Sequence, residues 1–261
     1  MIEQCLQIRE NILRIAHKNK HGHIPSCFSI VEILYAIYKG MNQRPDDPLW
    51  EDRDLFVLSK GHGALAHYCT LAGFGYFDIA EVESLGEHGS AFGCHACRKN
   101  IAGIEISTGS LGHGIGVAVG MALAAKIKKS NRRIFALIGD GEANEGSVWE
   151  SVMVATNLCL PALTVIYDDN LSHGRGLQIP NPARRLEAFG CSATEVDGHD
   201  IEALSKALFR APGNNVNAVV ANTQKGFGCP TMINNHYEWH GKAPNDSDFK
   251  HLMEELHAQT V

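Results

Sequence analysis

The sequence lacks an apolar run of the roughly eighteen residues that a membrane-spanning helix needs. Its first segment, MIEQCLQIREN, does not read as a signal peptide either, because Glu3, Arg9 and Glu10 interrupt it. An excess of basic charge is also missing: 29 acidic residues outnumber 23 basic ones, for a formal net charge of -6. These absences argue against a membrane protein and against a nucleic-acid binder.

Disulfide spacing, internal repeats and low-complexity linkers are absent as well. The eight cysteines are scattered, so we interpret them as reduced thiols of a cytoplasmic protein. The 261 residues are 44% hydrophobic, enough for a sizeable core. We therefore expect residues 1–261 to form one domain.

Apolar periodicity alternates between helical and strand-like along the chain. Strands are predicted at residues 55–58, 134–138, 163–167 and 216–222. Helices are predicted at residues 2–17, 29–38, 147–158 and 201–210, from the segment GSLGHG to about residue 129, and briefly near the C-terminus. Residues 86–103 read as a loop. This alternation predicts an α/β fold with a mostly parallel central sheet and helices on both faces.

Polar residues follow two consecutive predicted strands. Asp140 lies between Gly139 and Gly141 after the strand RRIFALI, and Asn170 ends LTVIYDDN. Ligands of open parallel sheets bind beyond the carboxyl ends of the strands. Carboxylate and amide oxygens suit magnesium, and the glycines let the backbone approach a phosphate. The pair therefore predicts a magnesium-bridged diphosphate, although GDG alone reads equally well as a tight turn with an Asp cap.

Six motifs in order carry a resemblance to a known family. They are LSKGHG at 58–63, GIEISTGSLGHG at 103–114, GDGEANEG at 139–146, VDGHD at 196–200, TQKGFG at 223–228 and WHG at 239–241. GDG followed by Asn about thirty residues on is similar to the thiamine-diphosphate signature. The chain resembles the N-terminal, diphosphate-binding domain of transketolase over nearly its whole length.

The resemblance implies thiamine diphosphate and Mg²⁺ as cofactors and a role for each matching residue. The implied metal ligands are Asp140, Asn170 and the backbone carbonyl of Ser172. The implied catalytic histidines are His23, His62, His95 and His240, with His23 and His95 along the substrate channel. The implied cofactor-binding residues are His62, Gly109, Ser110, Leu111, Gly139, Asp140, Gly141, Glu142, Asn170 and His240. Glu145 and Glu150 match carboxylates at a subunit contact.

Several positions depart from the family pattern. Ile24 rather than proline follows His23, the second channel histidine lies in CHACRK, and His113 stands where glutamine is usual. The run after Asn170 is short. These changes lead us to expect a substrate other than the commonest pentose phosphates. Cys94 and Cys97 could suggest zinc, but a single CxxC is a weak signal and a reduced pair near the channel is the favoured interpretation.

A full transketolase continues with two further domains, which the resemblance assigns to binding the pyrimidine half of the cofactor and to activating it. We therefore expect a split enzyme, in which two copies of this chain join two copies of a separately encoded subunit (α2β2) and act on sugars or sugar phosphates. The small residues Gly116, Gly120 and Ala124 give one helix a thin face suited to close packing. The alternatives are another thiamine-diphosphate enzyme subunit, deoxyxylulose-phosphate-synthase-like or of the 2-oxoacid dehydrogenase type, or a non-catalytic cofactor-binding module. SKGH, VDGHD and WHG together favour transketolase over the dehydrogenase type.

Overall fold

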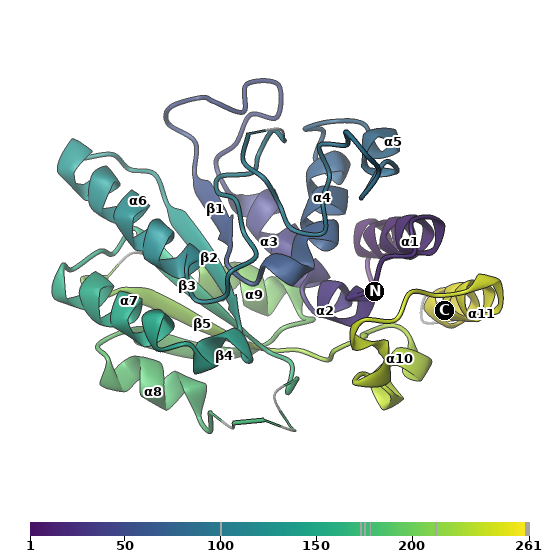
Figure 1. Ribbon diagram of the computed structural model, residues 1–261. Coiled ribbons are helices and arrows are strands. Elements are labelled where there is room, and N and C mark those ends of the chain that lie inside the picture. Colours follow the sequence, from purple (N-terminus) through teal and green to yellow (C-terminus); the bar gives the residue numbers. More distant parts are fainter. Residues whose placement is uncertain (100, 173, 175, 178, 212, 259–261) are drawn as a thin grey trace.

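The structure is a computed structural model that describes residues 1–99, 101–172, 174, 176–177, 179–211 and 213–258. Its strands are β1 (Leu55–Leu58), β2 (Ile134–Gly139), β3 (Leu163–Asp169), β4 (Ser192–Asp197) and β5 (Asn217–Asn222). They form one sheet in the order β1-β2-β3-β5-β4, and every neighbouring pair is parallel (Figure 1). The predicted α/β fold with a parallel sheet is therefore confirmed.

Helices cover both faces of the sheet, as predicted (Figure 1). Phe135 and Leu137 of β2 face one side, while Ile134, Ala136 and Ile138 face the other, because side chains alternate along a strand. The first side packs against α3 (Val31–Gly40), α4 (Ala64–Gly73) and α9 (Ile201–Leu208), and α1 (Glu3–Lys18) packs on α4 in turn. The second packs against α6 (Gly114–Lys128), α7 (Gly146–Asn157) and α8 (Pro182–Ala188).

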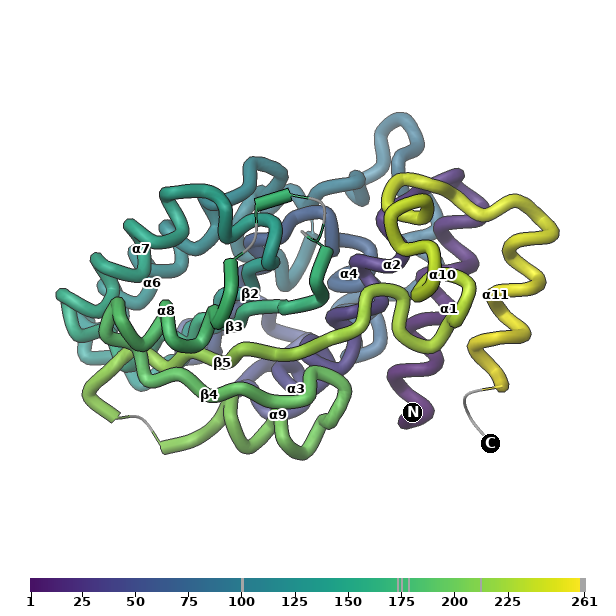
Figure 2. The backbone as a smooth tube through the Cα atoms, turned by 90° about the horizontal axis from the view of Figure 1, so that it is seen from below, coloured from purple at the N-terminus to yellow at the C-terminus, as the bar shows by residue number. Residues whose placement is uncertain are grey.

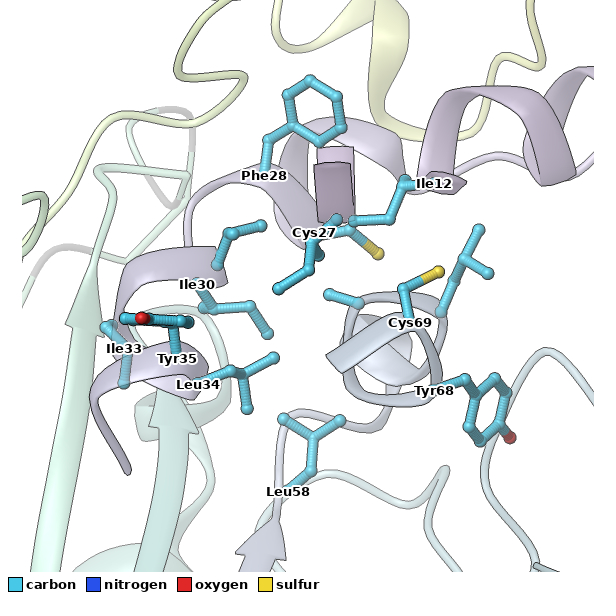
Figure 3. Packing of buried hydrophobic residues seen from close by; sticks show 14 of the residues in the cluster. Ile12, Cys27, Phe28, Ile30, Ile33, Leu34, Tyr35, Leu58, Tyr68 and Cys69 are labelled. Carbon is cyan, nitrogen blue, oxygen red and sulfur yellow. The ribbon is translucent and has the colours of Figure 1, made fainter. Parts of the chain in front are cut away.

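The shorter helices and the terminal helix complete the layer beside α1. They are α2 (Ile24–Phe28), α5 (Ile79–Val82), α10 (Pro230–Asn234) and α11 (Asp246–Ala258). Helices α1 and α11 lie side by side although they come from opposite ends of the chain (Figure 2). Buried side chains of α2, α3, α4 and β1 meet in one core, with Cys27 and Cys69 among them (Figure 3). None of the helices in the described ranges has both the length and the apolar character that a membrane span requires.

One strand has no counterpart in the sequence prediction. Strand β4 reads SATEVD and lies at the edge of the sheet, where its residues are only partly buried or exposed. An edge strand needs no continuous apolar run, so hydrophobic periodicity does not reveal it. Helices α2, α4, α5, α8 and α10 also lack a predicted counterpart, whereas the four predicted strands agree within two residues.

The strand register brings separate motifs to one edge of the sheet. Gly139 pairs with Asp168, and Asp169 pairs with Asn222, so β2, β3 and β5 end side by side. The residues that follow these strands therefore lie close together, as the carboxyl ends of parallel strands must.

Candidate active site

Asp140 and Asn170 meet at this edge, as the sequence predicts. The backbone N–H of Ser172 donates to Asp140 Oδ2 at 2.7 Å and to Asn170 Oδ1 at 3.1 Å, so both oxygens point toward the same spot. Both side chains are buried. Both are hard oxygen ligands, and both face one electropositive N–H group. Such a pair fits magnesium, which takes its remaining ligands from phosphate and water.

Ser172 reaches the same spot in a different way from the one expected. Its N–H and its hydroxyl both donate to Asp140, the hydroxyl to Oδ1 at 2.6 Å. Leu171, just before it, has a left-handed backbone with φ +56°. The contact of Ser172 with Asp140 is therefore in place, while metal binding by its backbone carbonyl stays a prediction.

The turn after β2 is tight, as the alternative interpretation of GDG expects. Gly141 N–H donates to Asp140 Oδ1 at 2.7 Å, and a short 3-10 turn over Glu142–Asn144 follows. Helix α7 begins only at Gly146, so the 3-10 turn stands between the Asp140 turn and the helix N-terminus. A methyl group on Gly139 would lie 3.6 Å from the Lys60 side chain, which shows how closely these segments approach. Contact of Gly139 and Gly141 with a diphosphate stays a prediction.

Three of the four predicted histidines form a cluster. The ring of His23 lies 5.0 Å from that of His240 and 5.9 Å from that of His62, and the rings of His62 and His240 are 6.4 Å apart. The backbone N–H of His23 donates to the carbonyl of His240 at 3.1 Å, which ties the first motif to the last. His23 takes a left-handed backbone, φ +63°, to enter α2.

The pKa values of the three clustered histidines are all lowered, which favours the neutral imidazole at pH 7. Burial, followed by nearby cations and other histidines, lowers the pKa of His240 to about 4 and holds the pKa of His62 well below its usual range. Burial and then His95 lower the pKa of His23. A neutral imidazole can both accept and donate a hydrogen bond, which suits a proton carrier or a contact with a sugar hydroxyl.

His95 lies beside the loop that the resemblance assigns to the cofactor. A Cβ built on Gly109 would meet the His95 ring at 3.5 Å, and Gly109 has φ +136°, a backbone that favours glycine. Gly109, Ser110 and His95 are exposed, and Leu111 is half-buried. Cys94 and Cys97 are free thiols, and no group of three or more metal-binding His, Cys, Asp or Glu side chains occurs among the described residues.

Glu142 lies beneath the site rather than in it. Its carboxylate accepts from the Ser59 hydroxyl at 2.5 Å, from Gly112 N–H at 2.8 Å and from Gly139 N–H at 3.1 Å. The Glu142 side chain therefore forms hydrogen bonds with three of the sequence motifs, SKGH, GSLGHG and GDG. The Glu142 carboxylate faces inward, so only the backbone of Glu142 can contact the cofactor, and that contact stays a prediction.

The residues expected at subunit contacts are exposed. Glu145 and Glu150 lie on the surface at α7, and Gly116, Gly120 and Ala124 form an open face on α6. Large apolar side chains are exposed on the same two helices and just after α7: Val117, Ile127, Met153, Val154 and Leu158.

Two lysines at the site have no part in the sequence-based prediction. Lys225 follows β5, and its Nζ lies 3.1 Å from His240 Nδ1. Burial, followed by Lys60, lowers the pKa of Lys225 to about 8, and the nearby Asp140 and Asp168 oppose that shift. Lys60 follows β1 and pairs with Asp168 at 2.5 Å. Both lysines come shortly after strands, β1 and β5. The position of ligand-binding residues beyond strand ends, which predicts Asp140 and Asn170, therefore also points to these two lysines.

Several known proteins with similar sequences are transketolases or subunits of transketolases. Residues 4–259 match the family described as transketolase, thiamine diphosphate binding domain. The chain is 36% identical over 255 residues to a protein of Actinobacillus succinogenes named as one subunit of an apulose-4-phosphate transketolase, covering 95% of this chain and 92% of that one. It is 38% identical over 235 residues to a 6-deoxy-6-sulfo-D-fructose transketolase subunit of Clostridium sp., covering 87% and 85%.

Longer transketolases match over their first part only. The human enzyme is 37% identical over 271 residues, which cover 98% of this chain but 42% of the human one. The solved transketolase structure from Campylobacter jejuni superposes with a TM-score of 0.87 at 28% identity, covering 98% of this chain and 43% of that chain. Sequence motifs, sheet order, site geometry and both kinds of comparison agree, and the chain belongs to the transketolase family, as a thiamine-diphosphate-binding domain of the N-terminal type.

Proposed function

We propose that this chain is the diphosphate-binding subunit of a split transketolase, which moves a two-carbon ketol unit from a ketose to an aldose. The observation that supports this most is the convergence of the Asp140–Asn170 pair and the histidine cluster on one edge of the sheet. As one domain in the cytoplasm, the chain would hold Mg²⁺ through Asp140, Asn170 and Ser172. Lys225 and His240 would meet the negative charge of the diphosphate.

Thiamine diphosphate, when bound, supplies the stabilised carbanion that breaking a carbon–carbon bond beside a ketone requires. The chain's own residues orient substrate and manage protons. His23, His62 and His240 stay neutral at pH 7, so each can accept a proton from a hydroxyl or donate one to it. His95 would extend this row along the substrate channel.

A second subunit is part of the proposal. Two relatives of similar length are named as transketolase subunits, and the chain spans only 42% of the human enzyme. We propose that the partner holds the pyrimidine-binding and C-terminal domains, and that two copies of each chain assemble. The exposed apolar side chains of α6 and α7, with Glu145 and Glu150, are the contact surface we assign to this assembly.

The substrate is proposed to be a sugar or sugar phosphate outside the commonest pentose phosphates. The run CHACRK around the second channel histidine departs from the family pattern, and that histidine, His95, lies against the Gly109 loop. Two relatives are named for apulose 4-phosphate and for a sulfo-sugar, so subunits of this kind do serve unusual sugars.

A two-tube assay tests the proposal. One tube contains this chain with thiamine diphosphate, Mg²⁺, hydroxypyruvate and a panel of aldoses and aldose phosphates. The other adds a neighbouring gene product that carries a pyrimidine-binding domain. We expect ketose only in the second tube, and none there with the Asp140→Ala variant. Ketose from this chain alone would refute the need for a partner, and complex formation without ketose would favour a specialised substrate or a non-catalytic module.

A further inference from the structure

Asp168 is a buried carboxylate that no proposed step of the chemistry uses. It lies on β3, two residues before Asn170, and is 0% exposed. Its Oδ2 accepts from Lys60 Nζ at 2.5 Å, from Asn170 Nδ2 at 2.7 Å and from the Ser29 hydroxyl at 3.0 Å. Its Oδ1 accepts from the Thr223 hydroxyl. One side chain therefore connects segments that follow β1, β3 and β5.

These bonds decide which atom of Asn170 faces Asp140. The Asn170 Nδ2 group has two acceptors on its inner side, Asp168 Oδ2 at 2.7 Å and Ser29 Oγ at 3.3 Å. Turning the amide over would place its oxygen against a carboxylate oxygen and leave the carboxylate without that donor, which is costly in a buried site. Asn170 Oδ1 is consequently held on the outer side, toward Ser172.

The backbone of Asp168 also supports the other oxygen ligand. The N–H of Asp140 donates to the Asp168 carbonyl at 3.1 Å. Asp168 thus contacts Asp140 through its main chain and Asn170 through its side chain. Both members of the oxygen pair are held by the same buried residue.

We propose that Asp168 is a positioning residue for the metal site: by accepting from the Asn170 amide, it presents Asn170 Oδ1 to the cation. This inference rests on the proposed function, because it assumes that Asp140 and Asn170 hold a divalent cation. Such outer partners orient metal ligands, and their loss typically weakens metal binding about 10- to 100-fold.

A simpler role exists for Asp168, as the charge partner of buried Lys60. Two substitutions separate the roles. In Asp168→Asn the charge is lost, but the new side chain can keep its oxygen toward Lys60 and Asn170 and turn its N–H₂ toward the Thr223 hydroxyl, which can accept. In Asp168→Leu the acceptor is lost as well. Both variants leave Lys60 without a counter-charge, so both should lose stability.

The test is Mn²⁺ binding to the full chain in the presence of thiamine diphosphate, measured as free Mn²⁺ by electron paramagnetic resonance. Wild type, Asp168→Asn, Asp168→Leu and Asp140→Ala are compared, with thermal unfolding recorded for each. We expect the Kd for Mn²⁺ to rise about 10- to 100-fold in Asp168→Leu and less than about tenfold in Asp168→Asn. If Asp168→Leu does not fold, the double variant Asp168→Leu, Lys60→Met removes the buried charge and should show the same loss of Mn²⁺.

The outcomes separate the two proposals. Equal weakening in Asp168→Asn and Asp168→Leu would show that charge rather than hydrogen bonding matters and would overturn the positioning role. Unchanged Mn²⁺ affinity in a folded Asp168→Leu protein would overturn it too, with the metal site intact. Absence of Mn²⁺ binding in wild type, or binding that Asp140→Ala leaves unaltered, would instead reject the metal site and the positioning role together.

Discussion

Removing the Glu142 carboxylate should loosen three motifs at once. Glu142 is 1% exposed, and its two oxygens accept from the Ser59 hydroxyl and from the N–H groups of Gly112 and Gly139. In Glu142→Ala both backbone donors lose their partner inside the protein. A buried donor left unpaired costs about 1–3 kcal/mol, so the two together give about 2–6 kcal/mol.

Part of that loss is offset. Burial raises the pKa of Glu142 despite its three donors, so the ionised carboxylate is itself costly to bury. We therefore expect Glu142→Ala to lower the free energy of unfolding by about 2–4 kcal/mol. Glu142→Gln keeps an oxygen for Ser59 and Gly112, which share Oε1, and turns an N–H₂ toward Gly139. Glu142→Gln should lower the free energy of unfolding by about 1–2 kcal/mol, because the hydrogen bond from the Gly139 N–H is lost.

Urea unfolding followed by circular dichroism measures both values, and an unchanged slope shows that the unfolded state is unaltered. Glu254→Ala, an exposed carboxylate of α11, is the control and should stay within about 0.5 kcal/mol of wild type. The reasoning is refuted if Glu142→Ala is as stable as this control, or if Glu142→Gln is the less stable of the two Glu142 variants.

Three further predictions concern charge, pH and assembly. Lys225→Met removes the cation 3.1 Å from His240 and should weaken thiamine diphosphate binding about 10- to 100-fold in calorimetry, whereas Lys250→Met, at an exposed lysine of α11, should not. Burial lowers the pKa of His67 to about 3, so the unfolded state binds the extra proton below pH 6.5, and His67 alone should lower the free energy of unfolding by about 2–3 kcal/mol between pH 6.5 and 4.5. His67→Phe should show a shallower fall in the same urea titrations; an equal fall would contradict the assignment. Ile127→Asp, on the exposed face of α6, should reduce the mass of the assembly in sedimentation equilibrium, while Lys250→Asp on α11 should leave it unchanged.

The sequence predicts the sheet well where burial is complete. Strands β1, β2, β3 and β5 are largely apolar because helices cover both of their faces. Edge strand β4 escapes prediction because half-exposed positions do not need apolar side chains. Helix α4 escapes it because ALAHYCTLAG is buried on nearly every side and shows no polar face.

The site is predicted in part for a related reason. Asp140 and Asn170 follow strands that the periodicity identifies, so their meeting follows from sheet geometry. The pairing of His23 with His240 joins residues from opposite ends of the chain, and only the family motifs point to it before the structure does. The inward direction of Glu142 and the bonds around Asp168 depend on side-chain packing, which no spacing rule encodes.

The most direct test of the account is where the cation binds. Crystals of the chain grown with thiamine diphosphate and Mn²⁺ allow the metal to be located by its anomalous scattering. The account predicts one strong peak between the Asp140 carboxylate and Asn170 Oδ1, in contact with the diphosphate and near Lys225 and His240. A peak elsewhere, or a diphosphate bound at this edge of the sheet without metal, would contradict it.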